Sequence, residues 1–368
     1  MEYKRIDELT TVVTGGTPST AVSEYWENGS IPWLQSGCCQ NCDVNSTEKY
    51  ITQLGLDNSS ARMMPIDTVM IALTGATAGK IGYLNFEACG NQSITGIFPC
   101  EELNQRFLYY YLISLRPKIL SDCVGGAQAH ISQGYVKNIR VPVFSLEKQS
   151  KIAECLNKAQ SIIDYRQKQL QSLDELIKAR FVEMFGDPII NSKHLKTNSL
   201  KDVLILKAGD FTAAADISDE QTAANPYPCY GGNGIRGYVS EYNQEGEYSL
   251  VGRQGALSGN VQFASGRFKN TEHALLVTPV VNINSIWLYH LLLNLDLKRY
   301  QTGAAQPGLS VKNLQEIQII CVPIYEQIKF AEFVAHIDKS KFIYLGGIYY
   351  DNRYFERNDS SCRWQRAG

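Results

Sequence analysis

Two halves of this chain carry the same pattern of residues. The segment GGAQAHISQGYVKNI aligns with GAAQPGLSVKNLQEI, so that Gln128 matches Gln306 at an offset of 178 residues. Each segment leads into a strand-like stretch that contains proline (RVPVF and CVPIY) and then into a helix-like stretch (KQSKIAECLNKAQ and EQIKFAEFVAHID). A repeat of this length predicts two similar domains, each followed by a helix.

The repeat also contains a glycine-rich segment that superficially looks like a phosphate-binding loop. In LTGATAGKIG the two glycines of the turn align with Gly255 and Gly259 of the second half, at an offset of 180 residues. A P-loop needs four residues between its first glycine and the Gly-Lys pair, and then Ser or Thr, whereas this segment has three and then Ile. Lys80 also aligns with Asn260. We therefore predict a tight turn between two strands in both halves, with different side chains exposed on each.

A long helix is expected between the halves, because residues 146–185 contain neither proline nor glycine. At 1.5 Å per residue it would be roughly 60 Å long, and Gly186 and Pro188 would end it. Mostly apolar residues recur in alternating steps of four and three, which is typical of a coiled-coil seam. The seam positions are Ile152, Leu156, Ala159, Ile163, Arg166, Leu170, Leu173, Ile177, Arg180 and Met184.

The second copy supplies a shorter partner helix that starts near Tyr325. Phe330, Val334 and Ile337 continue the seam, and Gly346-Gly347 ends the helix. The polar, aromatic and basic residues after this point have neither a helical nor a strand period, and we interpret them as a loosely ordered tail.

Composition describes an ordinary globular protein, with 44% hydrophobic and 20% charged residues. The start, MEYKRIDELT, is polar, and no apolar run approaches the roughly 20 residues that span a bilayer, so we expect a cytoplasmic protein. Cys38, Cys39 and Cys42 offer one C-x-x-C pair but no second pair, so we expect reduced thiols and no metal. The net charge of −2 means that any DNA binding must come from locally arranged cations or from a partner.

These features together resemble the specificity subunit of Type I restriction–modification systems. The resemblance rests on the duplicated unit, on a helix that begins with P-x-x-x-x-x-x-Q and then I/F-A-E, on GGTPST followed by YWENGSIPWLQSG, and on LDELIKARFVEMFGDP. It covers nearly the whole chain, to about residue 345. The shortened second helix and the tail depart from the family pattern.

The resemblance implies a mixed α+β fold with two target recognition domains held apart by antiparallel coiled-coil helices. Each domain would read one half of a bipartite double-stranded DNA sequence. Two methyltransferase (modification) subunits, which bind S-adenosylmethionine and methylate adenine, would dock on the chain, and a restriction/translocase subunit would join them. The chain itself would perform no chemistry and need no cofactor. The expected segments are a first recognition domain (1–146), a central helical region (147–187), a second recognition domain (188–324), a distal helix (325–345) and a tail (346–368).

Antiparallel pairing has a further consequence for the seam. The start of the distal helix would pack near the end of the central helix, so that Phe330, Val334 and Ile337 cover its last seam residues, Met184, Ile177 and Leu173. The first seam residues, Ile152, Leu156 and Ile163, would then lack a partner within the chain.

Base reading needs side chains that donate and accept hydrogen bonds in the grooves of DNA, and the loops of both halves are rich in them. Lys and Arg would mostly hold phosphates, whereas amides and Arg253 would be better base readers. The candidates are, in the first half, Gln35, Ser36, Thr74, Thr77, Lys80, Gln128 and His130, and in the second half Tyr230, Asn233, Arg236, Arg253, Gln254, Asn270, Thr271, His273 and Gln306.

Two other functions remain open from the residues alone. A stand-alone DNA adenine methyltransferase is suggested by NPYP at 225–228 followed by GGNG, although no long βαβ pattern surrounds this segment. A coiled-coil interaction scaffold would explain the helices but not the duplicated glycine turn. A nuclease or hydrolase is weaker, because no GxSxG or HExxH motif is present.

Overall fold

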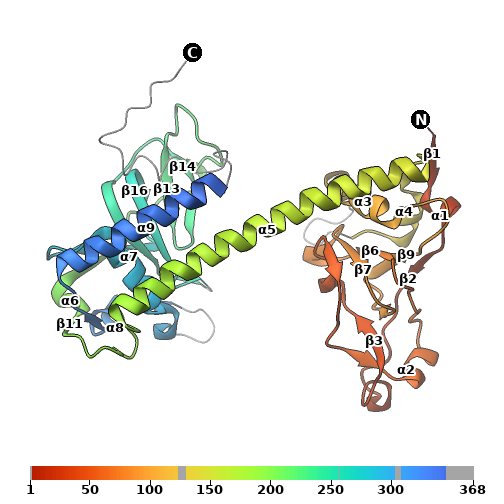
Figure 1. The fold of residues 1–368 in the computed structure, drawn as a ribbon, viewed down its shortest axis with the longest axis horizontal. Coiled ribbons are helices and arrows are strands. Elements are labelled where there is room, and N and C mark those ends of the chain that lie inside the picture. The colour runs from red at the N-terminus through yellow and green to blue at the C-terminus, as the bar shows by residue number, and fades with distance from the viewer. Residues whose placement is uncertain (1, 123–129, 256, 303–307, 345–368) are drawn as a thin grey trace. The chain divides into compact units, whose positions relative to one another are not determined.

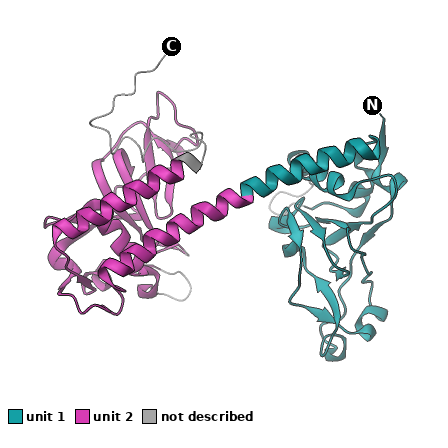
Figure 2. Ribbon diagram, in the orientation of Figure 1, with its two compact units in different colours: residues 1–163 teal, residues 164–368 magenta. Residues whose placement is uncertain are grey.

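The computed structural model describes residues 2–122, 130–255, 257–302 and 308–344. The chain divides into two compact units, Met1–Ile163 and Asp164–Gly368, which we call unit 1 and unit 2 (Figure 1; teal and magenta in Figure 2). The long helix α5 (Leu146–Phe185) begins in unit 1 and ends in unit 2. Gln128, Gln306 and the predicted tail lie outside the described residues.

Unit 1 is built on a five-stranded sheet with the order β2-β9-β6-β7-β4, a three-stranded sheet β5-β3-β8 and the pair β1-β10. Helix α3 packs on β6 and β7. The strands are β1 (Tyr3–Arg5), β2 (Val12–Thr14), β3 (Ile31–Leu34), β4 (Cys42–Val44), β5 (Tyr50–Ile51), β6 (Val69–Ala72), β7 (Ile81–Leu84), β8 (Cys89–Gly90), β9 (Ile94–Ile97) and β10 (Arg140–Pro142). The helices are α1 (Ile6–Leu9), α2 (Gln53–Asp57), α3 (Gln105–Ser121) and α4 (Gln133–Asn138).

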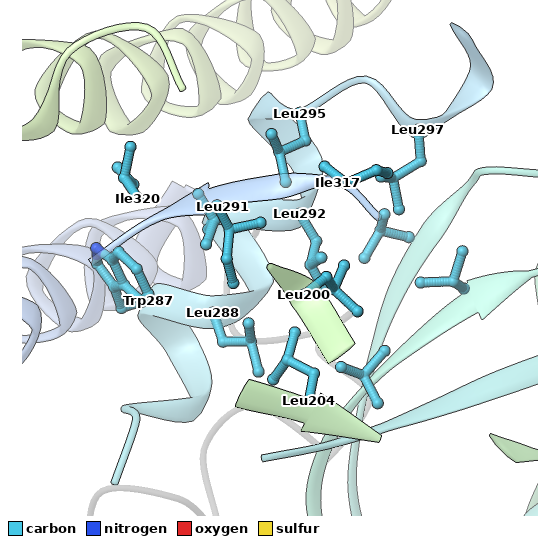
Figure 3. Packing of buried hydrophobic residues seen from close by; sticks show 14 of the residues in the cluster. Leu200, Leu204, Trp287, Leu288, Leu291, Leu292, Leu295, Leu297, Ile317 and Ile320 are labelled. Atoms are coloured by element: carbon cyan, nitrogen blue, oxygen red, sulfur yellow. The ribbon is translucent and has the colours of Figure 1, made fainter. Parts of the chain in front are cut away.

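Unit 2 is built on a six-stranded sheet with the order β12-β17-β15-β16-β13-β14 and the pair β11-β18. Helix α7 packs on β15, β16 and α9, and its Trp287, Leu288, Leu291 and Leu292 lie in the core that Figure 3 shows. The strands are β11 (Thr197–Ser199), β12 (Leu204–Ala208), β13 (Tyr227–Gly231), β14 (Gly234–Val239), β15 (Gln244–Gly252), β16 (Val261–Asn270), β17 (Ala274–Pro279) and β18 (Gln318–Ile320). The helices are α6 (Leu200–Val203), α7 (Ser285–Asn294), α8 (Val311–Gln315) and α9 (Ile324–Tyr344).

A buried glutamine attaches a helix to the sheet domain in the same way in both units; the helix is α5 in unit 1 and α9 in unit 2. Gln149 of α5 donates to the carbonyl of Phe144 (2.9 Å) and accepts from the amide of Asn104 (2.8 Å), the residue that caps α3. Gln327 of α9 donates to the carbonyl of Val322 (2.7 Å) and accepts from the amide of Asn284 (2.8 Å), which caps α7. Both glutamines are almost completely buried. The duplication predicted from the sequence is therefore confirmed down to single hydrogen bonds.

Within unit 2, the second half of α5 packs antiparallel to α9. Phe330 lies 5.4 Å from Phe181 and 5.8 Å from Phe185 between ring centroids, and Lys341 forms an ion pair with Asp174 (2.6 Å). Residue numbers therefore fall along α9 as they rise along α5, as expected. Ile177 is buried, as the predicted seam requires. Beyond it the prediction is wrong by one position: Phe181 and Phe185 are buried instead of Arg180 and Met184, because they pack on Trp287 of α7 as well as on α9.

The first half of α5 has a different environment. Ile152 packs against the core of unit 1, so the expectation that it lacks a partner is wrong. Leu156 and Ile163 are exposed, with 39% and 50% of their surface accessible, as expected. Across the described part of the chain, every helix is too short or too polar to cross a membrane.

Candidate nucleic-acid interface

The glycine-rich turn has the same backbone geometry in both units. In unit 1 the amide of Gly79 donates to the carbonyl of Ala72 (2.9 Å), and in unit 2 Gly259 donates to Gly252 (2.8 Å). All four turn glycines have positive φ, between +70° and +85°, which explains why glycine occurs at these positions in both copies. The turn joins two antiparallel strands, β6 to β7 and β15 to β16, whereas a P-loop joins a strand to a helix.

Two further loops join each turn to make one surface. In unit 1, Leu73 donates its amide to the carbonyl of Ser93 (2.8 Å) and accepts from Ile131 (2.8 Å). In unit 2, Arg253 occupies the position of Leu73: its amide donates to the carbonyl of His273 (3.0 Å), and its own carbonyl accepts from Leu309 (2.8 Å). Segments far apart in sequence are therefore adjacent at the same place in both units.

The unit 1 surface is mostly hydroxyl and amide in character. Thr74 pairs with His130 in an isolated β-bridge, and Thr77 lies within the same turn, with its hydroxyl 3.4 Å from the Thr74 carbonyl. Lys80 donates to the side-chain carbonyl of Gln40, a residue that sequence reasoning missed because no pattern along the chain links two positions 40 residues apart. Gln35 and Ser36 lie at the start of the 3-10 helix η2 (Ser36–Cys38), and the Gln35 side chain is exposed.

An ion pair supports the strand beside this turn. Arg106 of α3 forms two hydrogen bonds to the carboxylate of Asp43 on β4, one of them 2.9 Å long, and lies 3.5 Å above the centre of the Tyr83 ring. The Arg106 guanidinium holds the pKa of the Asp43 carboxyl below its usual range. This contact attaches β4, and with it the Gln40 segment, to the helix layer of unit 1.

The unit 2 surface carries more basic and amide groups. Arg253 is partly exposed and Gln254, which pairs with Gly308 in a β-bridge, is exposed. The His273 ring lies 3.1 Å from a carboxylate oxygen of Glu272. Asn233 accepts a hydrogen bond from Asn260 (2.8 Å), the residue that aligns with Lys80. Arg236 is exposed on β14, and the stem of its side chain covers Gly231.

Three of the predicted base readers are buried. Tyr230, Asn270 and Thr271 expose 3%, 1% and 0% of their surface. The hydroxyl of Thr271 donates to the carbonyl of Tyr230 (2.8 Å), and the Tyr230 ring packs edge-to-face on Phe268. Their burial argues against base contact, because a base edge reaches only side chains that are open to the groove. The bond from Thr271 to Tyr230 fixes the segment just before His273, whose carbonyl accepts the Arg253 amide.

Nothing in the described residues suggests a metal centre, since no three His, Cys, Asp or Glu side chains there could together hold an ion.

Comparison with protein families decides the class of the protein. A family model described as the Type I restriction modification DNA specificity domain matches residues 1–175 and 193–345. The chain belongs to this family. It is thus the DNA specificity subunit of a Type I restriction–modification system, and this subunit is non-catalytic.

Individual relatives of this specificity subunit agree. It is 29% identical to the Type I restriction enzyme EcoprrI specificity subunit of Escherichia coli over 355 residues, which cover 92% of this chain and 88% of the relative. It is 26% identical to the MjaIX specificity subunit of Methanocaldococcus jannaschii over 231 residues, which cover 61% and 53% of the two chains.

A solved structure shows the same fold. The S subunit of a Type I restriction–modification system from M. genitalium superposes with a TM-score of 0.54 at 20% identity, over 94% of this chain and 91% of that one. The expected class is therefore confirmed: a mixed α+β fold with two sheet-rich domains joined by long helices, of which α5 and α9 contact each other.

Proposed function

We propose that unit 1 and unit 2 each read one half of a bipartite double-stranded DNA sequence. The observation that supports this is the pair of glycine turns, which share their backbone hydrogen bonds and differ in the side chains they present. Where unit 1 has Thr74 and His130, unit 2 has Gln254 and Gly308. A constant frame with variable donors and acceptors suits two recognition surfaces with different targets.

Within each surface, we assign phosphate contacts and base contacts to different residues. Lys80 would hold a phosphate, because it is a flexible point charge, whereas amide, hydroxyl, imidazole and guanidinium groups offer directed hydrogen bonds to base edges. The proposed base readers are Gln35, Ser36, Thr74, Thr77 and His130 in unit 1, and Asn233, Arg253, Gln254 and His273 in unit 2. Arg236, like Lys80, would hold a phosphate. Gln128 and Gln306 stay candidates from the sequence, and the buried Tyr230, Asn270 and Thr271 are assigned to loop support.

We also infer that the chain works in the cytoplasm as part of an assembly with two methyltransferase subunits and a restriction/translocase subunit. The net charge of −2 leaves this chain with little electrostatic attraction for DNA of its own. Partner subunits would add cationic surface. The exposed Leu156 and Ile163 would contribute to docking, because burial of a large apolar side chain is worth roughly 1.5–3 kcal/mol.

Single-molecule sequencing of methylated adenines, in cells that carry the complete system, tests this proposal. The expected result is one methylated sequence with two specified parts and an unspecified gap between them. A methylated sequence without a gap would contradict the proposal, as would methylation that does not depend on this chain.

A further inference from the structure

The segment that follows the first strand of each large sheet has the same backbone hydrogen bonds in both units. In unit 1 the amide of Gly16 donates to the carbonyl of Gly90 (2.8 Å), and in unit 2 the amide of Asp210 donates to the carbonyl of Asn270 (3.0 Å). The preceding residue is glycine in each case. A Cβ atom on Gly209, for example, would lie 2.1 Å from the Asn270 carbonyl oxygen. The next residues, Thr17 and Phe211, are therefore structurally equivalent.

These two equivalent residues have opposite chemical character. Thr17 is exposed and its hydroxyl donates to the side-chain carbonyl of Gln92. Phe211 exposes 79% of its surface, more than any other large hydrophobic residue in the described part of the chain. A bare aromatic side chain in water forgoes the stabilisation that its burial would give. Nothing in the fold of unit 2 requires it, because a threonine occupies the same position in unit 1.

The backbone that presents Phe211 is held in place on its N-terminal side. Asp210 accepts a hydrogen bond from the side chain of Asn243 (2.8 Å) and lies 3.7 Å from the ammonium group of Lys269. Asn243 in turn donates to the Asn270 carbonyl (2.9 Å), which also receives the Asp210 amide. Phe211 is thus an exposed ring on an anchored loop, directly beside the segment that carries His273.

The neighbouring surface is aromatic and basic. Tyr242, the residue before Asn243, is 39% exposed and packs edge-to-face on Tyr227 with centroids 4.9 Å apart. The Arg267 guanidinium lies 5.1 Å from the centre of the Tyr242 ring. Two of the acidic groups here have cationic partners, since Asp210 lies beside Lys269 and Glu245 pairs with Arg267. Aromatic faces with flanking cations are what stacked bases and phosphates require.

We propose that Phe211 is a wedge that inserts at one base step of the half-site read by unit 2. Apolar wedges of this kind partly unstack a base step and bend the duplex, which brings flanking cations onto phosphates. Unit 1, with the hydrogen-bonded Thr17 at the same position, would leave its half-site stacked. The inference rests on the proposed function, because it assumes that this surface faces DNA, and it adds that only one half-site is distorted.

The test uses the complex of this chain with its modification subunits and a duplex that carries the methylated sequence mapped in cells. 2-Aminopurine is placed in turn at each adenine of both half-sites other than the methylated adenine, because a methyltransferase flips that base out of the stack. The expected result is increased fluorescence at one step of the unit 2 half-site, and at none of the unit 1 half-site. Phe211→Thr should abolish the increase and weaken binding at least fivefold, the lower end for one aromatic–base stack. Phe211→Trp should preserve both.

Two controls distinguish loss of the wedge from misfolding and from the loss of any exposed apolar side chain. Phe211→Thr should fold normally, because threonine occupies the equivalent position in unit 1. Ile190→Ala removes another strongly exposed apolar side chain (71%), on the loop after α5, and should change neither fluorescence nor affinity. The inference is overturned if Phe211→Thr leaves both signals unchanged, or if it instead weakens binding of the modification subunits. If the wild-type complex recognises no bipartite sequence at all, the proposed function fails and the wedge with it.

Discussion

Unit 1 and unit 2 share a backbone frame and differ in what they present on it. The glycine turn, the loop contact at Leu73 or Arg253 and the glutamine that attaches the long helix have equivalent hydrogen bonds in both. The side chains at equivalent surface positions differ in size, charge and polarity, as Thr17 and Phe211 illustrate. The shared glycines and buried polar groups maintain the fold, so the exposed residues between them can differ without disturbing it, as the proposal of two different DNA half-sites requires.

The units also differ in how their long helices are covered. In unit 2 the second half of α5 packs on α9 around Phe330. Ile152, which aligns with Phe330, is only partly buried in unit 1, and Leu156 and Ile163 beyond it are exposed. The apolar face of the repeated helix is therefore buried in unit 2, where the helix is α9. In unit 1, where the equivalent helix is the first half of α5, part of this face is accessible.

The largest expected effect is on the aromatic core of unit 2. Phe330→Ala should lower its free energy of unfolding by about 3–5 kcal/mol, because it leaves a cavity among Phe181, Phe185 and His290. Ile152→Ala, at the equivalent position of unit 1, should cost clearly less. Denaturant titration followed by hydrogen exchange in each unit measures both. Equal losses would mean that the two helices are covered to the same extent.

The next effect concerns base discrimination. Arg253→Ala should relax the preference at one base pair of the unit 2 half-site by about 1–3 kcal/mol and leave the other half-site unchanged. Its equivalent, Leu73, is 4% exposed and cannot reach a base. Methylation rates on duplexes with single substitutions in each half-site provide the measurement. A uniform loss of affinity, with preserved base preference, would assign Arg253 to a phosphate instead.

A smaller effect is expected on the stability of unit 2 when the pH falls. Burial beside Tyr289 and Phe330, aided by the nearby Lys341 charge, lowers the pKa of His290 to about 3. Asp174 and Asp338 also face this site, and both pair with Lys341. In the unfolded chain the His290 imidazole takes up a proton near pH 6.5, whereas in the folded chain it stays neutral until about pH 3. The free energy of unfolding therefore falls as the pH drops below 6.5.

The loss at pH 5 should approach about 2 kcal/mol, and it should be confined to unit 2, because Tyr110 occupies the equivalent position in unit 1. Hydrogen exchange of each unit at pH 7 and pH 5 measures it. His290→Phe serves as the control and should remove most of the pH dependence between these values. An equal acid sensitivity of both units, or of the variant, would argue that other groups are responsible.

The smallest effect concerns Lys80. Lys80→Ala should remove one phosphate contact and lower the slope of log affinity against log salt by about one unit, without a change in sequence preference. Asn260→Ala, at the equivalent position of unit 2, should leave the slope unchanged. Filter binding between low and physiological salt suffices. Loss of nucleotide binding or of an ATPase activity in Lys80→Ala would instead revive the phosphate-loop interpretation.

The duplication, the glycine turns, the long helix and its shorter partner were all predictable, because each leaves a pattern along the sequence. The antiparallel orientation of the two helices was predicted from the family resemblance. The burial of Phe181 and Phe185 was not, since the heptad rule assumes a partner helix alone, whereas α7 adds Trp287 to the contact. Burial also separates Asn270 and Thr271 from truly exposed loop residues, although both look like polar loop positions in sequence. Phe211 was overlooked because a single aromatic in a loop has no periodicity to mark it.

The central claim, that each unit reads one half of the target independently, is tested most directly by exchanging one recognition domain. Residues 1–146 are replaced by the corresponding segment of a related specificity subunit, and methylated adenines are mapped in cells with the complete system. If the two units read independently, one half of the bipartite sequence changes while the other half and its base preferences persist. A change in both halves, or in neither, would contradict it.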